Sequence, residues 1–367
     1  MPPRPILRFL IRTWPLLGAL ALLTVMPVLL SLNRNGRVAV EASIFLPDMV
    51  LQVPLPFRPV DLISDAPTRE RVTIDYQSRN GPRSIEADLY LPAEGGIHTG
   101  VVFSMGAPPL ALDDPRLVRI AEDSARSGVV MLMPFSDRLD ELRIEPEEID
   151  ALVAEFQYVQ RLPQVDSNRV GFFGASVGGS LALVAAADPR IADEVDHIVS
   201  FGGYFDALTA SGAIATDRIQ YKDVDQKWKP SYHAHRVAAL QIIDRLDDPG
   251  ERDLLTRIFV DPYYDAADYN TGRGHIDGQP LSPEELAGLS AVARSAYNFL
   301  ANRDPGAVTD LIRTLPPDAV TELDYLSPKT SIDRVKAELF ILHDRGDPVI
   351  PYTESRRLKD ALGDRAR

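Results

Sequence analysis

Short apolar runs alternate with helical patterns through much of the chain. Three such runs, 100–104, 129–133 and 169–173, are separated by segments whose apolar residues recur every three or four positions. Two further runs follow at 197–201 and 339–342. Runs of this length suit strands that are buried on both faces. The alternation therefore predicts a mostly parallel sheet with helices on both faces.

The segments around these runs extend the α/β pattern. Residues 71–76 and 85–91 alternate polar and apolar side chains on either side of Asn80-Gly81, which predicts a hairpin. Helices are predicted over 146–161, over 176–187 and before Gly128.

Residues 207–330 break the alternation, because they contain helical patterns without a convincing strand. One helix is predicted to start at Ser282, which is followed by Pro283 and by Glu285 as in a capping box. Further helices are predicted over 233–246, 251–259 and 305–314. We interpret 207–330 as a helical cap between two parts of one core, 67–206 and 331–367.

The amino terminus has the pattern of a membrane segment. Residues 13–33 contain no charged side chain over 21 positions, and three arginines lie in the preceding segment 1–12. At about 1.5 Å per residue, such a helix spans roughly 30 Å, one hydrocarbon core. No small-x-small cleavage pattern follows, so an uncleaved signal-anchor is favoured over a cleaved signal peptide. The lipid bilayer is then a partner of the chain, with the body outside the cytoplasm.

Residues 34–66 are interpreted as a connector. Their proline-rich part, VPLPFRPVDLISDAPT, is predicted to be extended or irregular and not helical.

Charge divides the chain into two parts. Residues 1–40 hold five arginines and no acid, so of the net charge of −14 the remaining residues carry −14 − 5 = −19. A body this acidic repels phosphate backbones, which argues against nucleic-acid binding. Cysteine is absent, which excludes disulfides, thiolate metal sites and a cysteine nucleophile.

The strongest chemical motif is Gly174-Ala175-Ser176-Val177-Gly178, a G-x-S-x-G sequence. It follows an apolar strand and opens a helix, the context in which a serine sits on a sharp, strained turn. The helix amino terminus then offers backbone N–H groups to a developing oxyanion. Ser176 is therefore the candidate nucleophile, and tight helix–sheet packing is the simpler alternative for the small residues.

With this motif in this context, the chain resembles the α/β-hydrolase superfamily, of the serine esterase and dienelactone-hydrolase kind. The resemblance covers about 68–205 and 335–365. In the family the acid follows a late strand in a segment similar to H-G-x-x-D-x-x-V-P, and LFILHDRGDPVIP matches it with Asp347 at the acid position. The resemblance makes His343 a structural residue, and Asp206 is a weaker alternative acid.

The resemblance also implies an oxyanion hole of two backbone donors. One is the N–H of Val177, the residue after the nucleophile. The other is expected from the turn FSMGAPP, where Met105 replaces the usual histidine and Ala107 is the expected donor beside Gly106. The HGGG pattern of many lipases is missing.

The catalytic base is missing from this pattern. In the family order the histidine follows the acid, but no histidine follows Asp347. Either the sequence is a carboxy-terminally truncated part of a longer enzyme, which is the preferred explanation, or the protein is a degenerate hydrolase.

Other candidate sites are weaker. His233 and His235 would point about 200° apart on a helix, and they are interpreted as surface or packing residues. Trp228, Tyr263 and Tyr264 either line a pocket under the cap or pack its core. The sequence contains no metal-binding or dinucleotide motif, so no metal or cofactor is expected.

The sequence therefore predicts a membrane-anchored serine hydrolase that cleaves an ester or related acyl bond of a small-molecule substrate through an acyl-enzyme on Ser176. The alternative is a catalytically inactive, ligand-binding module of the same fold, since the base is missing. An enzyme that acts on lipid at the membrane surface is a third, weaker interpretation.

Overall fold

The computed structural model describes residues 43, 58–62, 64–107, 113–268, 271–276 and 280–365. The signal-anchor predicted at 13–33 lies outside these residues. No helix within the described ranges is long and apolar enough to cross a membrane.

The chain divides into two compact units. The smaller comprises the described residues up to 68 together with 92–94 and 113–128, and the larger comprises the other described residues. The smaller unit contains a 3-10 turn, η2 (Pro59–Leu62), and helix α3 (Pro115–Arg126). Within this unit Arg126 links helix α3 to the segment of η2, because its guanidinium donates to the Ser64 carbonyl at 2.9 Å and pairs with Asp61 at 2.9 Å.

The 3-10 turn corrects one expectation for the connector. Residues 59–62 are helical over one turn, where an extended or irregular segment was predicted. Pro59 opens this turn, where the missing N–H of proline leaves no helical hydrogen bond unmade.

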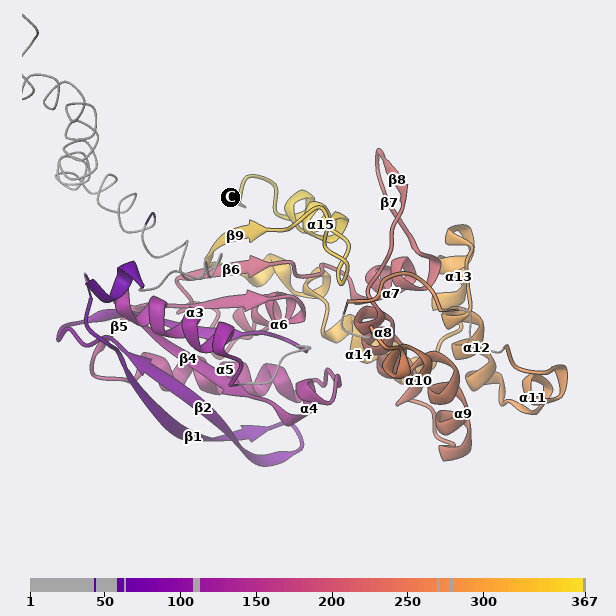
Figure 1. The fold of residues 1–367 in the computed structure, drawn as a ribbon, viewed down its shortest axis with the longest axis horizontal. Helices are drawn as coiled ribbons and strands as arrows, with labels where there is room; N and C mark the ends of the chain where they lie inside the picture. The colour runs from indigo at the N-terminus through magenta and orange to yellow at the C-terminus, as the bar shows by residue number, and fades with distance from the viewer. Residues whose placement is uncertain are drawn as a thin grey trace, which may run out of the picture. The chain divides into compact units, whose positions relative to one another are not determined.

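A seven-stranded sheet forms the centre of the larger unit, and its strand order is β1-β2-β4-β3-β5-β6-β9 (Figure 1). Strands β2 and β4 are antiparallel, whereas β4, β3, β5, β6 and β9 pair in parallel. The mostly parallel sheet is therefore confirmed. The strands are β1 (Thr68–Ser78), β2 (Gly81–Leu91), β3 (His98–Ser104), β4 (Val129–Phe135), β5 (Val165–Ala175), β6 (His197–Phe201) and β9 (Glu338–Leu342).

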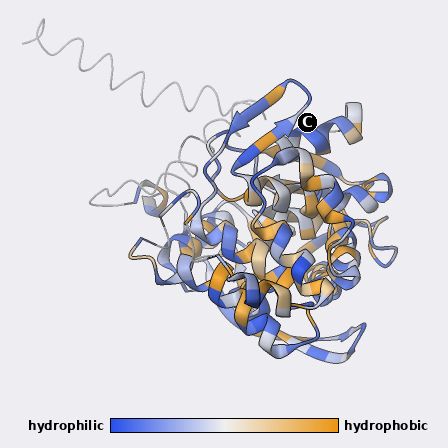
Figure 2. Cartoon of the chain, turned by 90° about the vertical axis from the view of Figure 1, so that its right-hand side faces the viewer, coloured by the Kyte–Doolittle hydropathy of each residue, from blue (hydrophilic) through white to orange (hydrophobic). Residues whose placement is uncertain are grey.

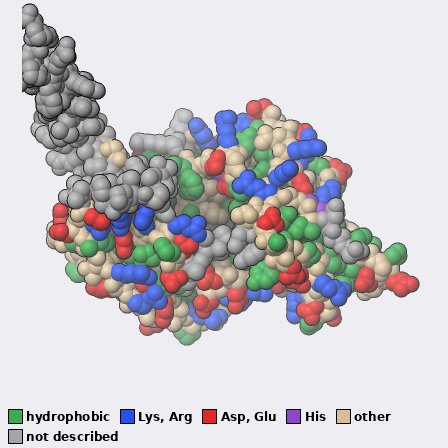
Figure 3. Space-filling view, in the orientation of Figure 1, with side chains coloured by type: hydrophobic (Ala, Val, Ile, Leu, Met, Phe, Trp, Pro, Cys, Tyr) green, Lys and Arg blue, Asp and Glu red, His purple; other side chains and the backbone are tan. Residues whose placement is uncertain are grey.

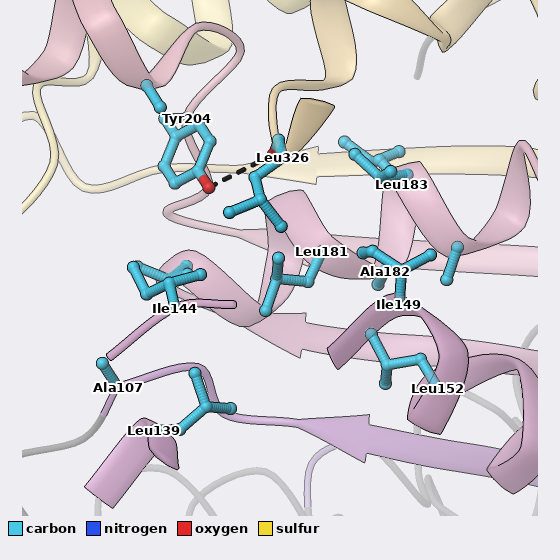
Figure 4. Close-up of a cluster of buried hydrophobic side chains, with 14 of the residues drawn as sticks. Ala107, Leu139, Ile144, Ile149, Leu152, Leu181, Ala182, Leu183, Tyr204 and Leu326 are labelled. Atoms are coloured by element: carbon cyan, nitrogen blue, oxygen red, sulfur yellow. Dashed lines mark hydrogen bonds between the residues drawn. The ribbon is translucent and has the colours of Figure 1, made fainter. Parts of the chain in front are cut away.

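Two helices, α5 (Glu147–Gln160) and α6 (Val177–Ala186), pack against each other and against the central strands β3 and β5. Their contact with the sheet is apolar: the ring of Phe156 stacks on Phe172 at 5.6 Å between centroids. Each large side chain that is buried in such a layer stabilises the fold by about 1.5–3 kcal/mol. Figure 4 shows part of this core, with Leu181 of α6 and Leu152 of α5 among its members.

The segment between β6 and β9 is mostly helical, as predicted. The predicted capping box at Ser282 and Glu285 is present, with both reciprocal hydrogen bonds. Figure 2, which looks at the molecule from this side, shows hydrophobic and hydrophilic stretches alternating along the helices. The helices are α7 (Ala207–Thr216), α8 (Tyr232–Ile243), α9 (Pro249–Phe259), α10 (Asp261–Asp265), α11 (Pro283–Gly288), α12 (Ala291–Leu300), α13 (Val308–Ile312) and α14 (Pro317–Tyr325).

The cap also contains an antiparallel hairpin that was not predicted, formed by β7 (Arg218–Tyr221) and β8 (Val224–Lys227). Of its eight strand residues only Ile219 is buried. Strands this short and this polar lack the apolar alternation on which sequence-based strand prediction depends.

After β9 the described chain ends with α15 (Thr353–Leu362) and the turn η6 (Gly363–Arg365). Figure 3 shows acidic and basic side chains interspersed over the viewed face of the molecule.

Candidate active site

Ser176 occupies a strained turn between β5 and α6. Its backbone has φ 55° and ψ −134°, which lies outside the left-handed helical region that residues other than glycine tolerate. Such conformations cost about 1–3 kcal/mol and persist where surrounding structure enforces them. Here the Ser176 N–H donates to the Phe201 carbonyl at 2.8 Å, and its carbonyl accepts from Gly179 N–H at 3.0 Å. The expected strained strand-to-helix turn is therefore present.

The glycines of the G-x-S-x-G motif allow this turn to pack closely. A Cβ on Gly174 would lie 2.5 Å from the Gly178 carbonyl oxygen, and a Cβ on Gly178 would overlap the Ser104 carbonyl. The end of β5 approaches α6 at Gly174, and the end of β3 approaches α6 at Gly178, so closely that only glycine fits at either position. The structure therefore supplies a steric reason for each glycine.

The turn after β3 lies against the amino terminus of α6. A Cβ on Gly106 would lie 2.5 Å from Gly178 N and 2.9 Å from Val177 Cβ, and Gly106 has a positive φ of 77°. Ala107 follows directly and is buried. The structure thus brings together the two segments that carry the predicted oxyanion donors, the N–H groups of Val177 and Ala107.

Asp347 lies in the turn after β9. Its Oδ1 accepts from Val349 N–H at 2.7 Å and Ile350 N–H at 3.2 Å, while its Oδ2 faces Gly202, whose hypothetical Cβ would lie 3.1 Å away. A side chain at residue 202 would therefore crowd this carboxylate.

The ends of β5, β6 and β9 are tied together by backbone hydrogen bonds. Phe201 accepts from Ser176 N–H, and Gly202 N–H donates to the Leu342 carbonyl at 2.8 Å. Ser176 and Asp347 therefore sit at the same edge of the sheet, separated by the end of β6.

His343 is held inside the turn that carries Asp347. Its Nδ1 lies 2.6 Å from Ser355 Oγ, and its Nε2 lies 3.0 Å from the Ile350 carbonyl and 3.3 Å from Asp347 Oδ2. A carbonyl oxygen only accepts, so Nε2 carries the proton and Nδ1 accepts from the serine hydroxyl. Both ring nitrogens are thus engaged, Nε2 within this turn and Nδ1 with Ser355 of α15, which is the arrangement expected of a structural residue.

Asp206, the weaker candidate acid, caps α7. Its Oδ1 accepts from Leu208 N–H at 3.0 Å, and its Oδ2 pairs with Lys329 at 2.9 Å. This carboxylate therefore stabilises a helix terminus and a cap contact. The segment is held from the other side by buried Glu354, which accepts from the N–H groups of Phe205 and Asp206.

None of the six histidines is a hydrogen-bond partner of the Ser176 hydroxyl in the described part of the chain. His98 and His197 lie at the amino-terminal ends of β3 and β6, opposite the edge that carries Ser176. His233, His235 and His275 lie in the cap, and His343 is engaged as described above. The structure thus places a candidate nucleophile, acid and oxyanion turn at one edge without a base.

His233 and His235 are both buried, so the expectation of packing residues is met and that of surface residues is not. His233 Nε2 lies 2.9 Å from the Ala107 carbonyl oxygen, whereas His235 stacks on Tyr263 with ring centroids 4.4 Å apart. The first contact was missed by sequence reasoning, because nothing in the local pattern relates His233 to Ala107.

The three aromatic residues considered for the pocket have different surroundings. Trp228 donates from Nε1 to the Asp347 carbonyl at 2.9 Å, Tyr263 is buried beside His235, and Tyr264 is exposed, with the Arg236 guanidinium over its ring. None of them lines the cavity next to Val177.

That cavity is small and almost entirely apolar. It measures about 50 Å³ and reaches from Val177 to Val349 and Ile350 in the turn of Asp347. Helices α7 and α8 of the cap supply much of its wall, including Ala207, Ala210, Ile214, Ala234 and Ala238. Tyr204, another lining residue, donates its hydroxyl to the Leu326 carbonyl at 3.2 Å (Figure 4).

Part of the chain matches known hydrolases. Residues 149–247 match the family model of acetyl xylan esterases (AXE1), a range that contains β5, Ser176 and α8. The hydrolase acrC of Aspergillus aculeatus is 32% identical over 151 residues, which cover 36% of this chain and 35% of that protein. The chain thus spans about a third of the length of the curated relative that it matches.

Solved structures show weaker similarity. An acylaminoacyl peptidase from Pyrococcus horikoshii aligns over 83% of this chain and 36% of its own, with 14% identity and a TM-score of 0.44. An esterase from Pyrobaculum calidifontis aligns over 50% of this chain and 58% of its own, with 21% identity and a TM-score of 0.33. Both TM-scores lie below 0.5, so the comparison of folds rests on the strand order and on the matched region 149–247.

A strained serine between a buried parallel strand and a helix, inside a region that matches an esterase family, is the arrangement typical of α/β-hydrolases, which this chain resembles.

Proposed function

We propose that the protein is a serine hydrolase that cleaves an ester or related acyl bond through an acyl-enzyme on Ser176. The observation that carries this proposal is the backbone of Ser176, at φ 55° and ψ −134° on the amino terminus of α6. A strained conformation at a reactive side chain points to function, because packing alone would favour glycine there.

In the proposed reaction, the Ser176 hydroxyl attacks the substrate carbonyl and the oxygen of that carbonyl becomes an oxyanion. The N–H groups of Val177 and Ala107 donate to the oxyanion. A histidine base removes the proton of the hydroxyl, and Asp347 orients that base. The tetrahedral intermediate then collapses: the ester C–O bond breaks, and the alcohol leaves with the proton returned by the base. Water hydrolyses the resulting acyl-enzyme by the same route, which releases the acid and restores the Ser176 hydroxyl. None of the histidines at positions 1–367 is assigned this role.

The apolar cavity beside Val177 supports a short acyl group. Its 50 Å³ has room for roughly four water-sized groups. This size suits an acetyl group, and acetyl esters are also what the name of the matched family specifies. We therefore propose a short-chain acyl ester of a small molecule as the substrate.

The uncharged stretch at 13–33 supports membrane attachment as part of this proposal. The chain would cross the bilayer once, with the hydrolase body outside the cytoplasm, because more arginines precede the stretch than follow it.

A fluorophosphonate probe tests the nucleophile directly. The full-length protein is expected to react at Ser176, and the Ser176→Ala variant is expected to be unreactive. Ser295→Ala, which changes a half-buried serine of α12, serves as the matched control and should react like the wild type. Absence of labelling in folded wild-type protein would overturn the proposal and favour a ligand-binding module.

A further inference from the structure

The cap touches both turns that flank Ser176. From the segment that leads into α8, Trp228 donates from Nε1 to the Asp347 carbonyl at 2.9 Å, and Ser231 N–H donates to the Pro348 carbonyl at 2.6 Å. Two residues later, His233 contacts the Ala107 carbonyl at 2.9 Å. A short stretch of the cap thus holds the turn of the candidate acid and the turn of the candidate oxyanion donor.

The contact of His233 with Ala107 has a defined direction. A carbonyl oxygen only accepts, so Nε2 of His233 carries the hydrogen and donates it. Burial lowers the pKa of His233, which favours the neutral ring with this single Nε2–H. Both partners are buried, at 6% exposure for His233 and 4% for Ala107, so water does not readily replace the hydrogen bond.

The residue that accepts this hydrogen bond also carries the second proposed oxyanion donor. The Ala107 N–H can serve an oxyanion only if the backbone of this residue keeps one orientation. On the amino-terminal side, Gly106 is fixed by its packing on Val177 and Gly178. On the carboxyl-terminal side, the described contact that fixes the carbonyl is the one from His233.

We propose that His233 is a positioning residue, which holds the oxyanion turn from the cap by donating a hydrogen bond to the Ala107 carbonyl. The inference rests on the proposed function, because it gives the turn a role in catalysis. Helix α8 would then help to position a catalytic group, in addition to forming part of the wall of the apolar cavity beside Val177.

Two other residues of α8, Gln241 and His235, distinguish this positioning role from general packing of the cap. Gln241 donates to the Leu142 carbonyl at 2.9 Å and accepts from Ile144 N–H at 3.1 Å, so it holds a different segment of the core. His235 has the same side chain and a similar burial of 7% exposure, but it stacks on Tyr263. His235→Leu is therefore the matched control for His233→Leu.

The experiment combines amide hydrogen exchange with steady-state kinetics on the full-length protein. In His233→Leu, exchange of the amides at 105–107 is expected to rise about tenfold, which corresponds to the loss of one net hydrogen bond. With a short-chain ester, kcat is expected to fall at least roughly tenfold while KM stays within about twofold, because the oxyanion forms only in the transition state.

His233→Gln is the rescue variant, because the Gln amide nitrogen can replace Nε2 as a donor. It is expected to restore slow exchange at 105–107 and most of kcat. His235→Leu should leave exchange at 105–107 and the ratio of kcat to KM close to wild type. Thermal melting of each variant reports any general loss of cap stability.

Two results would overturn the inference: unchanged exchange at 105–107 in His233→Leu, or equal losses in His233→Leu and His233→Gln. If the wild-type protein shows no esterase activity and no probe labelling, the proposed function fails. In that case the exchange data for the Leu and Gln variants still decide whether His233 holds the turn.

Discussion

At the scale of single residues, the strained backbone of Ser176 lowers the stability of the fold at the candidate site. Its conformation suits glycine, yet the position holds a side chain with a hydroxyl group. Backbone hydrogen bonds to Phe201 and Gly179 and the close packing of Gly174 and Gly178 enforce that conformation. The strain is therefore maintained by the neighbours and presents the hydroxyl at the helix terminus.

Replacing Ser176 should reveal this strain. Ser176→Gly is expected to be more stable than Ser176→Ala by about 1 kcal/mol, because relief of strain exceeds the entropic cost of glycine. Urea unfolding of both variants measures the difference. Ala182→Gly, in the interior of the same helix, should lose stability by a similar amount. A Ser176→Gly variant less stable than Ser176→Ala would contradict strain at this position.

At the scale of elements, α5 buries three carboxyl groups, those of Glu148, Asp150 and Glu155, of which Asp150 pairs with two arginines. Glu148 accepts from Ser136 Oγ at 2.8 Å, and burial raises its pKa to about 7. Glu155, two turns later, is fully buried, and burial raises its pKa well above the usual value. Both groups favour the protonated form in the folded state, so the helix packs best when they are uncharged.

Stability should therefore fall as the pH rises from about 5 to 8. The folded-state pKa of Glu148 lies above its value in the unfolded chain, so the folded protein binds the proton more tightly. The contribution is complete below the unfolded-state pKa and is lost as the pH rises through about 7, by an amount on the order of 3 kcal/mol.

Glu148→Gln tests this pH dependence, because the amide oxygen can still accept from Ser136. Relative to wild type, the variant should gain stability between pH 5 and pH 8, measured as unfolding free energy in urea. Glu141→Gln, which changes an exposed residue, is the control and should follow the wild-type curve. Parallel curves for wild type and Glu148→Gln would refute the raised pKa.

At the scale of the whole molecule, charge separates a basic amino-terminal segment from an acidic body. The five arginines of residues 1–40 flank the uncharged stretch 13–33, and the other residues carry a net −19. Three of these arginines precede the stretch and two follow it, and the flank with more basic residues tends to be retained on the cytoplasmic side of a membrane. The proposed attachment to a membrane thus follows from a property of the sequence and concerns the intact chain.

Membrane fractionation of the intact chain tests this attachment. The protein should sediment with membranes, resist extraction by high salt and alkaline carbonate, and be released by detergent. Ala21→Arg combined with Leu22→Arg should weaken insertion, since each central arginine costs about 2.5–3.5 kcal/mol. The control, Ala19→Leu, keeps the stretch apolar and should stay with the membrane. A wild-type protein extracted by salt alone would refute the anchor.

Most of the fold could be predicted from the sequence because burial imposes a local period. Apolar runs in the sequence predict strands β3, β4, β5, β6 and β9, and apolar stripes at helical spacing predict helices α5 and α6. The β7–β8 hairpin could not be predicted, because its short polar strands depend on their mutual pairing and not on a buried face.

The candidate site divides in the same way. The sequence by itself determined Ser176, through a local motif, and suggested Val177, Ala107 and Asp347 through resemblance to a family; their catalytic roles stay predictions. Each of these positions is recognised from a few neighbouring residues, so a single stretch of chain is sufficient to name it.

Only the tertiary structure decided which distant segments meet at this edge of the sheet. It placed β9 beside β6 across the whole cap, packed Gly106 on the start of α6, and brought His233 to the carbonyl of Ala107, 126 residues away in sequence. Contacts at such separations leave no periodic signal along the chain. They are selected by the packing of the complete core, where a buried donor must find an acceptor.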